Sequence, residues 1–121
     1  MRVAVVGAGS IGAVLGAKLA ATGHDVTLIA RGAHLAAIRG NGLTLVDKVG
    51  KHSGNYRLLA GDDPSAFRLQ DLVIVSLKAH AIAAMLPRMR TLVAEHTVVI
   101  PAINGLPWWY FHGVGLSLIH I

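Results

Sequence analysis

The chain has 121 residues and no cysteine; 54% of its residues are hydrophobic, 14% are charged, and the formal net charge is +5. This composition excludes a disordered chain, a disulfide framework, a thiolate metal site and a cysteine nucleophile, and it fits a cytoplasmic protein of one domain. The basic residues are scattered and no apolar run reaches the roughly 18 residues that span a bilayer, so we expect neither nucleic acid nor membrane as a partner.

The hydrophobic pattern predicts alternating strands and helices. In chain order these are a strand over residues 2–6, a helix over 10–22, a strand over 25–30, a short helix over 33–39, a two-stranded hairpin over 43–47 and 56–60, a helical turn at Pro64, a strand over 71–77, a helix over 80–94 and a strand over 97–102. Gly23 should end the first helix, and the turn pair Gly40–Asn41 with Gly42 the second. Pro87 should kink or divide the third helix. Such alternation predicts an α/β fold with a mostly parallel sheet, whose ligand lies at the carboxyl ends of the strands.

A glycine pattern, G-x-G-x-x-G, follows the first strand at Gly7, Gly9 and Gly12. In a Rossmann-type, doubly wound fold these glycines allow a tight turn, a close approach of the backbone to a pyrophosphate, and packing of the helix on the strand. The helix start adds free N–H groups and the positive end of its dipole. An alternative is a signal peptide, but the glycines would weaken its helical core. The residues expected to contact a dinucleotide here are Gly7, Ala8, Gly9, Ser10, Ile11 and Gly12.

Arg31 stands at the end of the second predicted strand. A cofactor with a free ribose 2′-hydroxyl usually meets an Asp or Glu at this position, about 20 residues beyond the glycines. An arginine cannot accept hydrogen bonds from the hydroxyl, but its planar fork matches a 2′-phosphate. The alternative is a solvated surface arginine. The position favours NADP over NAD, and the positive charge of the chain suits an anionic small molecule.

Two further polar residues follow predicted strands at the same edge of the sheet. Lys78 could bind a phosphate or a substrate carboxylate, or could simply be solvated. Asn104, in the pair Asn104–Gly105, is either a turn residue or an amide that holds the nicotinamide or a substrate oxygen. The seven histidines lack the spacing of a helical metal pair, and Ser10 belongs to the glycine turn rather than to a hydrolase elbow. We therefore expect no metal and no serine triad.

Four landmarks occur in order: GAGSIGAVLGAKLAATGHDVTLIARG, the hairpin, DLVIVSLKAH and VVIPAINGLPWWYF. Together they resemble the amino-terminal domain of the ketopantoate reductase (2-dehydropantoate 2-reductase) family. The resemblance implies that NADPH reduces a 2-keto acid, 2-dehydropantoate, to pantoate by hydride transfer, a step toward pantothenate and coenzyme A. It implies that Asn104 lies between nicotinamide and substrate. The cofactor-binding residues that it implies are Gly7, Gly9, Gly12, Arg31 and Lys78.

The resemblance covers residues 1–113, which we expect to form an NADP-binding Rossmann domain, with 114–121 as a short tail, unstructured or non-native. The family takes its proton-donor lysine from a helical carboxyl-terminal domain, which the 121 residues do not include. The chain alone should therefore bind cofactor better than it reduces substrate. Two alternatives stay open: a non-catalytic NADP(H)-binding module, and a reductase of a different 2-keto or 3-hydroxy acid.

Four consecutive aromatic residues, Trp108 to Phe111, follow the last predicted strand. Such residues typically pack in an interface between domains, and direct contact with the substrate is the alternative. Without a second domain, residues 106–111 should form an exposed apolar patch. We expect such a patch to favour self-association.

Overall fold

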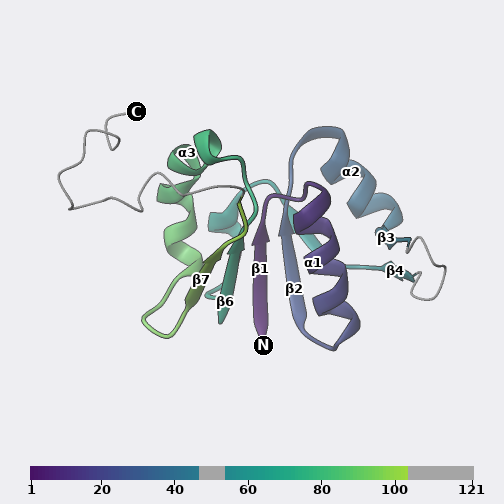
Figure 1. The fold of residues 1–121 in the computed structure, drawn as a ribbon, viewed down its shortest axis with the longest axis horizontal. Coiled ribbons are helices and arrows are strands. Elements are labelled where there is room, and N and C mark those ends of the chain that lie inside the picture. The colour runs from purple at the N-terminus through teal and green to yellow at the C-terminus, as the bar shows by residue number, and fades with distance from the viewer. Residues whose placement is uncertain (47–53, 104–121) are drawn as a thin grey trace.

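The computed structural model describes residues 1–46 and 54–103 (Figure 1). Strands and helices alternate along these residues, as the hydrophobic pattern predicts. The elements are β1 (Arg2–Val6), α1 (Ser10–Ala21), β2 (Asp25–Ile29), α2 (Gly32–Asn41), β3 (Leu43–Leu45), β4 (Gly54–Tyr56), β5 (Leu59–Gly61), the 3-10 turn η1 (Pro64–Ala66), β6 (Leu72–Val75), α3 (Ala79–Met89), the 3-10 turn η2 (Arg90–Leu92) and β7 (Val98–Pro101).

The main sheet contains five strands in the order β5-β2-β1-β6-β7, and all of its neighbouring strands are parallel. The chain first builds outward from β1 through β2 and then crosses to the other side of β1 to form β6. The reversal between β1 and β6 is the switch point of a doubly wound sheet, where ligands bind at the carboxyl ends of the strands. The predicted α/β Rossmann-type fold is therefore confirmed.

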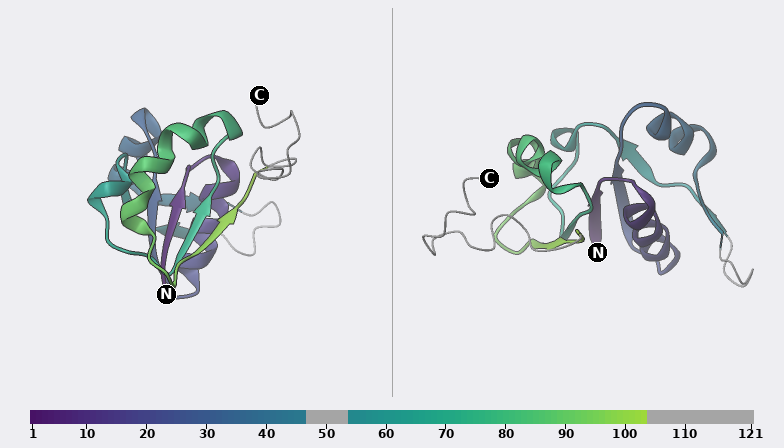
Figure 2. Two further views of the ribbon diagram at one scale, coloured as in Figure 1. Left: turned by 90° about the vertical axis from the view of Figure 1, so that its left-hand side faces the viewer. Right: turned by 45° about the horizontal axis from the view of Figure 1, so that its top comes forward.

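Helices cover both faces of the sheet (Figure 2). Alternate residues of β1 point to opposite faces: Val3 and Val5 pack in a core with α1 and α2, whereas Ala4 and Val6 pack in a core with α3 and η2. All four side chains are fully buried. Because both faces are covered, the central strands read as continuous apolar runs, which is why the sequence pattern identified them.

Backbone hydrogen bonds continue past the carboxyl ends of the central strands. The N–H of Gly7 donates to the carbonyl of Ile29 at 3.0 Å, and the N–H of Ser76 donates to the carbonyl of Val6 at 2.8 Å. The N–H of Ala30 donates to the carbonyl of Gly61 at 2.9 Å. The first residue of each loop that leaves these strands is therefore hydrogen-bonded to a neighbouring strand. These bonds hold the backbone at the edge of the sheet where a ligand is expected.

The predicted hairpin is correct in its first strand and wrong in its second. The strand β3 pairs with Gly54–Tyr56 in antiparallel register, while Leu59–Gly61 leaves the hairpin and pairs with β2 in the main sheet. The free edge of β2 offers backbone partners to this segment. Arg39 of α2 also fixes the segment, because its Nε donates to the carbonyl of Ala60 at 3.2 Å. Residues 56–60 are therefore divided between two sheets.

Two helix boundaries differ from the expected ones. The helix α2 continues through the Gly40–Asn41 pair and ends at Gly42, whose φ of 76° is a conformation that glycine adopts readily. The helix α3 continues past Pro87 and changes to the 3-10 turn η2 at Arg90. Pro87 removes the hydrogen bond to the carbonyl of Ala83, but both residues are exposed, so water can replace it.

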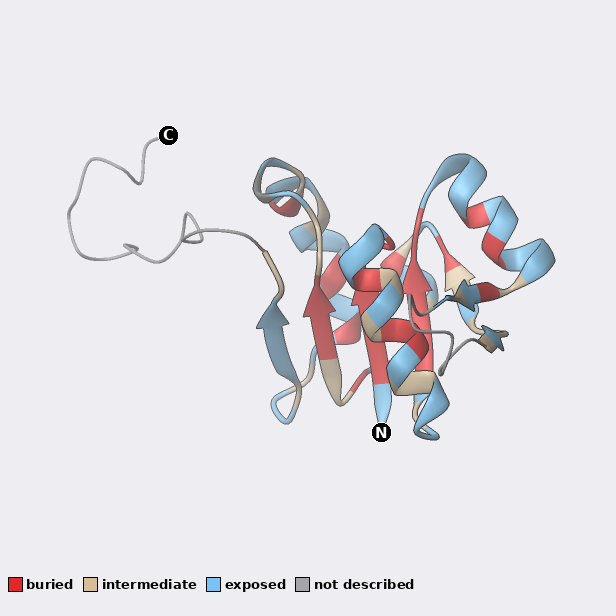
Figure 3. Cartoon of the chain, turned by 45° about the vertical axis from the view of Figure 1, so that its right-hand side comes forward, coloured by how far each residue is buried: buried red, intermediate tan, exposed pale blue. Residues whose placement is uncertain are grey.

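The strand β7 is exposed, unlike the neighbouring strand β6 (Figure 3). Val98, Val99 and Ile100 have exposed fractions of 57%, 45% and 45%. The strand lies at the edge of the sheet as far as the described residues show. The aromatic patch expected over residues 106–111 lies outside the described residues, as does the predicted domain boundary at residue 113.

Asp71 joins the amino ends of three strands. Its carboxylate accepts a hydrogen bond from the N–H of Arg2 at 2.8 Å, and its carbonyl accepts one from the N–H of Val98 at 3.0 Å. The Nε2 atom of His96 lies 3.3 Å from Asp71 Oδ1. The hydrogen bond from Arg2 holds the pKa of the Asp71 carboxyl below its ordinary value; desolvation opposes this effect and the charge of His96 adds to it.

The substitution Asp71→Asn is expected to lower stability at neutral pH and to have less effect in acid. The amide oxygen can still accept the hydrogen bond from Arg2, so the change isolates the charge. A carboxyl whose folded pKa is depressed stabilises the fold fully above the ordinary aspartate value of about 3.9, and this stability is lost as the pH falls through the lower folded value. Thermal unfolding of both proteins from about pH 7 to about pH 2 measures the difference. A difference in Tm that is the same at every pH would contradict this role.

Candidate functional site

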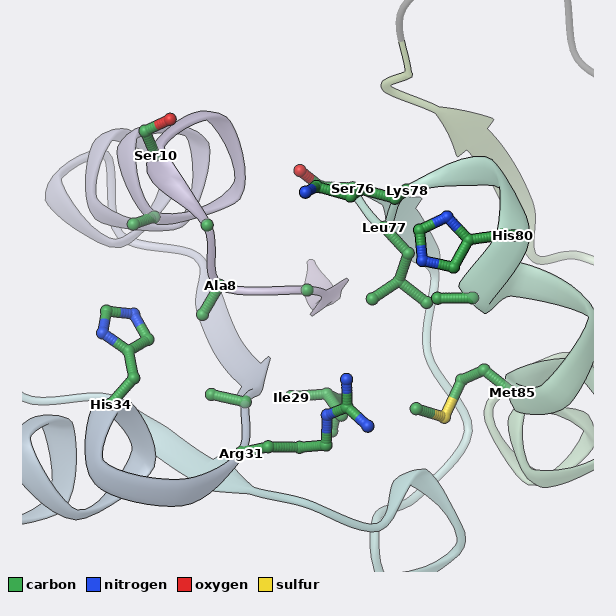
Figure 4. A pocket seen from close by; sticks show the side chains of 15 residues that line it. Ala8, Ser10, Ile29, Arg31, His34, Ser76, Leu77, Lys78, His80 and Met85 are labelled. Atoms are coloured by element: carbon green, nitrogen blue, oxygen red, sulfur yellow. The ribbon is translucent and has the colours of Figure 1, made fainter.

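A cleft of about 690 Å³ lies at the carboxyl ends of β1, β2 and β6, at the switch point of the sheet (Figure 4). Its walls come from the glycine turn after β1, the start of α2 and the start of α3. The residues that line it are Gly7, Ala8, Gly9, Ser10, Ala13, Ile29, Ala30, Arg31, His34, Ser76, Leu77, Lys78, His80, Ala81 and Met85. Residues from the glycine turn, Arg31 and Lys78 are far apart in the sequence, and the fold brings them to this one cleft.

The three glycines of the turn have different surroundings. Gly7 has a φ of 103°, and a Cβ added to it would lie 2.7 Å from the carbonyl oxygen of Ser76. A Cβ on Gly12 would collide with the carbonyl oxygen of Gly7. A Cβ on Gly9 would meet no atom within 4 Å. The fold therefore requires glycine at positions 7 and 12, whereas at position 9 the absence of a side chain leaves open space facing the cleft.

Three helices begin at this cleft, and none of them has a side-chain cap. The residues that precede the helices are Gly9 for α1, Arg31 for α2 and Lys78 for α3. None of these residues makes a capping hydrogen bond through its side chain, and none of the three first turns contains an acidic residue. The first N–H groups of each helix therefore remain available, together with the positive end of its dipole. Such helix ends favour anionic ligands.

The side chains add positive charge to the same space. Arg31 and Lys78 are exposed and line the cleft, with His34 and His80 on the same two walls. No Asp or Glu is found among the described residues that line it. Figure 4 shows Arg31 extending across the floor of the cleft toward Met85, and His34 pointing toward Ala8. The cleft is thus suited to an elongated ligand with more than one anionic group.

A second cleft of about 400 Å³ adjoins the first on the side of β7. It shares Gly9, Ser10 and Lys78 with the first, and it adds Ile11 and Ile103. Ile11, which was expected to contact a cofactor, faces this second cleft and is 50% exposed. Asn104 follows Ile103 directly in the chain but lies outside the described residues. Gly12 lines neither cleft and packs beneath the turn.

Several cleft residues were not identified from the sequence, including His34, Ser76 and His80. The spacing of the histidines argues only against a metal site and does not indicate a role beside Arg31 or Lys78. A usable signal exists for His34, because it follows Arg31 by three residues and so lies on the same side of the start of α2. Ser76 carries no such signal, since its place in the cleft depends on the pairing of β6 with β1.

Residues 1–46 and 54–103 contain neither a metal-binding cluster nor a membrane-spanning helix. Within these ranges no three His, Asp or Glu side chains come together in a way that could hold a metal ion. No helix in the same ranges is long and apolar enough to cross a bilayer. The expectation of a metal-free site remains a prediction.

Comparison with known proteins agrees with this arrangement. The family model described as ketopantoate reductase PanE/ApbA matches residues 3–107. A curated 2-dehydropantoate 2-reductase from Mesorhizobium japonicum is 43% identical over 116 residues, which are 95% of this chain and 35% of the relative. The chain therefore spans about a third of the length of that relative.

Two solved structures share the fold of this chain. A PanE/ApbA family ketopantoate reductase from Ralstonia eutropha JMP134 has a TM-score of 0.79 and 35% identity, over 87% of this chain and 35% of the solved chain. A ternary structure of D-mandelate dehydrogenase with NADH and anilino(oxo)acetate has a TM-score of 0.75 and 28% identity, over 88% and 34% of the two chains. The match of the family model to most of the chain, together with these relatives, shows that the chain belongs to the ketopantoate reductase family.

Proposed function

We propose that this chain is the NADPH-binding part of an enzyme that reduces 2-dehydropantoate to pantoate. One observation carries the proposal: three uncapped helix ends, Arg31 and Lys78 meet at one cleft whose described lining contains no carboxylate. NADPH is an elongated ligand with a pyrophosphate and a 2′-phosphate, so it has an anionic group for more than one of these helix ends.

The glycine turn fits a bound pyrophosphate. The open space at Gly9 is not needed for packing within the chain, because a Cβ there would contact nothing. A backbone without a side chain at the start of α1 lets phosphate oxygens approach the N–H groups closely. The residues proposed to hold this part of the cofactor are Gly7, Ala8, Gly9, Ser10 and Ile11, with Gly12 as the packing residue that keeps the turn in place.

Arg31 supports the choice of NADPH over NADH. It occupies the end of β2, where an NAD-binding fold usually has a carboxylate for the ribose hydroxyls. Its guanidinium can donate two parallel hydrogen bonds to a 2′-phosphate. The D-mandelate dehydrogenase with the related fold was solved with NADH, so the fold alone does not decide between the two cofactors, and the proposal rests on Arg31.

The substrate proposal follows from two curated relatives that are named 2-dehydropantoate 2-reductases, from Mesorhizobium japonicum and Pyrococcus horikoshii. Bound NADPH would supply hydride to a ketone carbon. The second cleft, between Lys78 and Ile103, is the proposed place for the nicotinamide and the 2-keto acid. Asn104, the next residue, is proposed to support the reaction by donating a hydrogen bond to the substrate oxygen, on which negative charge develops.

The 121 residues are expected to bind the cofactor without efficient turnover. Reduction of a ketone needs a proton donor near the oxygen. The resemblance to the family implies that this donor is a lysine in a helical carboxyl-terminal domain. The chain spans about a third of the length of its relatives. The reduction of substrate is therefore proposed for a whole enzyme that contains these residues. Reduction of a different 2-keto acid remains the second candidate, since D-mandelate dehydrogenase shares the fold at 28% identity.

The test is a calorimetric titration of the chain with NADPH, followed by an absorbance assay of NADPH oxidation with 2-dehydropantoate. We expect saturable binding of NADPH and little or no turnover. When the chain is supplied as the amino-terminal part of a full-length relative, NADPH oxidation should depend on 2-dehydropantoate. An absence of NADPH binding, or oxidation of NADPH with other 2-keto acids but not with 2-dehydropantoate, would contradict the proposal.

A further inference from the structure

His34 lies in the first turn of α2, three residues after Arg31. It is exposed, it lines the main cleft, and its imidazole points into the cleft toward Ala8 (Figure 4). Two other histidines have partners within the protein: His24 Nδ1 lies 3.3 Å from the terminal amine, and His96 pairs with Asp71. In the described part of the chain no hydrogen bond involves the His34 imidazole, so its ring nitrogens are available to a ligand.

The other described residues that line the cleft with His34 are all basic or neutral. Arg31 comes from the same end of α2, while Lys78 and His80 come from the start of α3. The opposite turn contributes Ala8, Gly9 and Ser10, which carry no charge. An imidazole N–H that lines a cleft with basic side chains and no carboxylate in the described lining is suited to an anion.

We propose that His34 is the second side chain of the 2′-phosphate site and helps Arg31 to select NADPH over NADH. This inference rests on the proposed function. A phosphate group has three acceptor oxygens, and one guanidinium can satisfy only some of them. The free N–H groups of the first turn of α2 and an imidazole N–H on the same turn supply the remaining donors.

Because the His34 imidazole points toward Ala8 of the glycine turn, contact with the 2′-phosphate must be distinguished from contact with the pyrophosphate by measurement. The pyrophosphate has its own site at the start of α1, next to the open space of Gly9. NADPH differs from NADH only by the 2′-phosphate, so a residue that contacts this group should affect one cofactor and not the other. His80 serves as the matched control, because it has the same chemistry and lines the same cleft from α3.

The experiment measures the Kd of NADPH and of NADH by calorimetry for the wild-type chain, His34→Ala, His34→Glu and His80→Ala. We expect His34→Ala to weaken NADPH about tenfold, the effect of losing one hydrogen bond to a charged group, and to change NADH less than about twofold. His34→Glu should remove the preference for NADPH altogether through repulsion. A glutamate in the first turn stabilises a helix, so this loss cannot be attributed to unfolding. His80→Ala should leave the ratio of the two Kd values unchanged.

The proposal is overturned if His34→Ala and His34→Glu leave the NADPH-to-NADH ratio of Kd values unchanged, including the case in which both cofactors weaken equally. Failure of the wider proposal gives a different result, because the wild-type chain would then show no preference for NADPH at all. A wild-type preference that Arg31→Asp removes and that the His34 variants leave intact would reject the role of His34 alone.

Discussion

The substitution Gly12→Ala is expected to destabilise the fold and to abolish cofactor binding with it. A methyl group at this position would collide with the carbonyl oxygen of Gly7 and lie 3.1 Å from Ser76 Oγ. The first of these contacts is with backbone, which cannot move aside by rotating a side chain. The turn after β1 must therefore shift, at a cost of about 1–3 kcal/mol or more. Thermal unfolding should show a lower Tm, and calorimetry should show no NADPH binding.

The substitution Gly9→Ala is the matched control for the loss of stability. It adds the same methyl group to the same turn, two residues after Gly7. Its new Cβ would meet open space, and the backbone there has a φ of −66° that alanine accepts. Stability should fall by less than about 1 kcal/mol, the scale of exchanging glycine for alanine before a helix. NADPH should nevertheless bind more weakly, because the methyl group occupies the space proposed for the pyrophosphate. Normal NADPH binding by Gly9→Ala would contradict that role.

The substitution Arg31→Asp is expected to weaken NADPH far more than NADH. It removes a charged, two-pronged donor and places a repelling carboxylate at the end of β2. Loss of one such contact costs about 1.5–3 kcal/mol, which is roughly a ten- to hundredfold change in Kd. NADH, which has hydroxyls at this place, should lose little affinity, since an aspartate can accept hydrogen bonds from them.

Arg68→Asp provides the comparison for the change in net charge. Arg68 is exposed and lies outside both clefts, before β6. Because its exposed charge makes no contact with either cleft and is screened by salt, this variant should bind both cofactors as the wild type does. If Arg31→Asp reduced the affinity for both cofactors by the same factor, the arginine would not be a 2′-phosphate ligand.

The elements predicted best are those that the local pattern determines. The strand–turn–helix over residues 2–22 and the strand over 71–77 were recognised because their apolar runs and glycines act within a few residues of one another. The second strand of the hairpin was misplaced because its segment is divided between β4 and β5. Local composition cannot show that Leu59–Gly61 pairs with β2, which lies some 30 residues away in the chain.

Only part of the site could be predicted, because the sequence shows local features and not the contacts between distant segments. Arg31 and Lys78 were identified because each follows a strand, and the rule that ligands bind at the carboxyl ends of parallel strands brings both to one edge. The sequence does not identify His34 as a site residue, because the role of a histidine on a short helix cannot be predicted until the cleft beside it is known. The roles of all these residues toward a cofactor remain proposals, and Asn104 lies outside the described residues.

The cleft is proposed to select a cofactor by its 2′-phosphate, and a comparison of two affinities tests this most directly. The wild-type chain is titrated with NADPH and with NADH in the same buffer, and the two Kd values are compared. The arrangement of Arg31, the start of α2 and the carboxylate-free lining predicts that NADPH binds at least about tenfold more tightly. Equal affinities, or tighter binding of NADH, would contradict the claim.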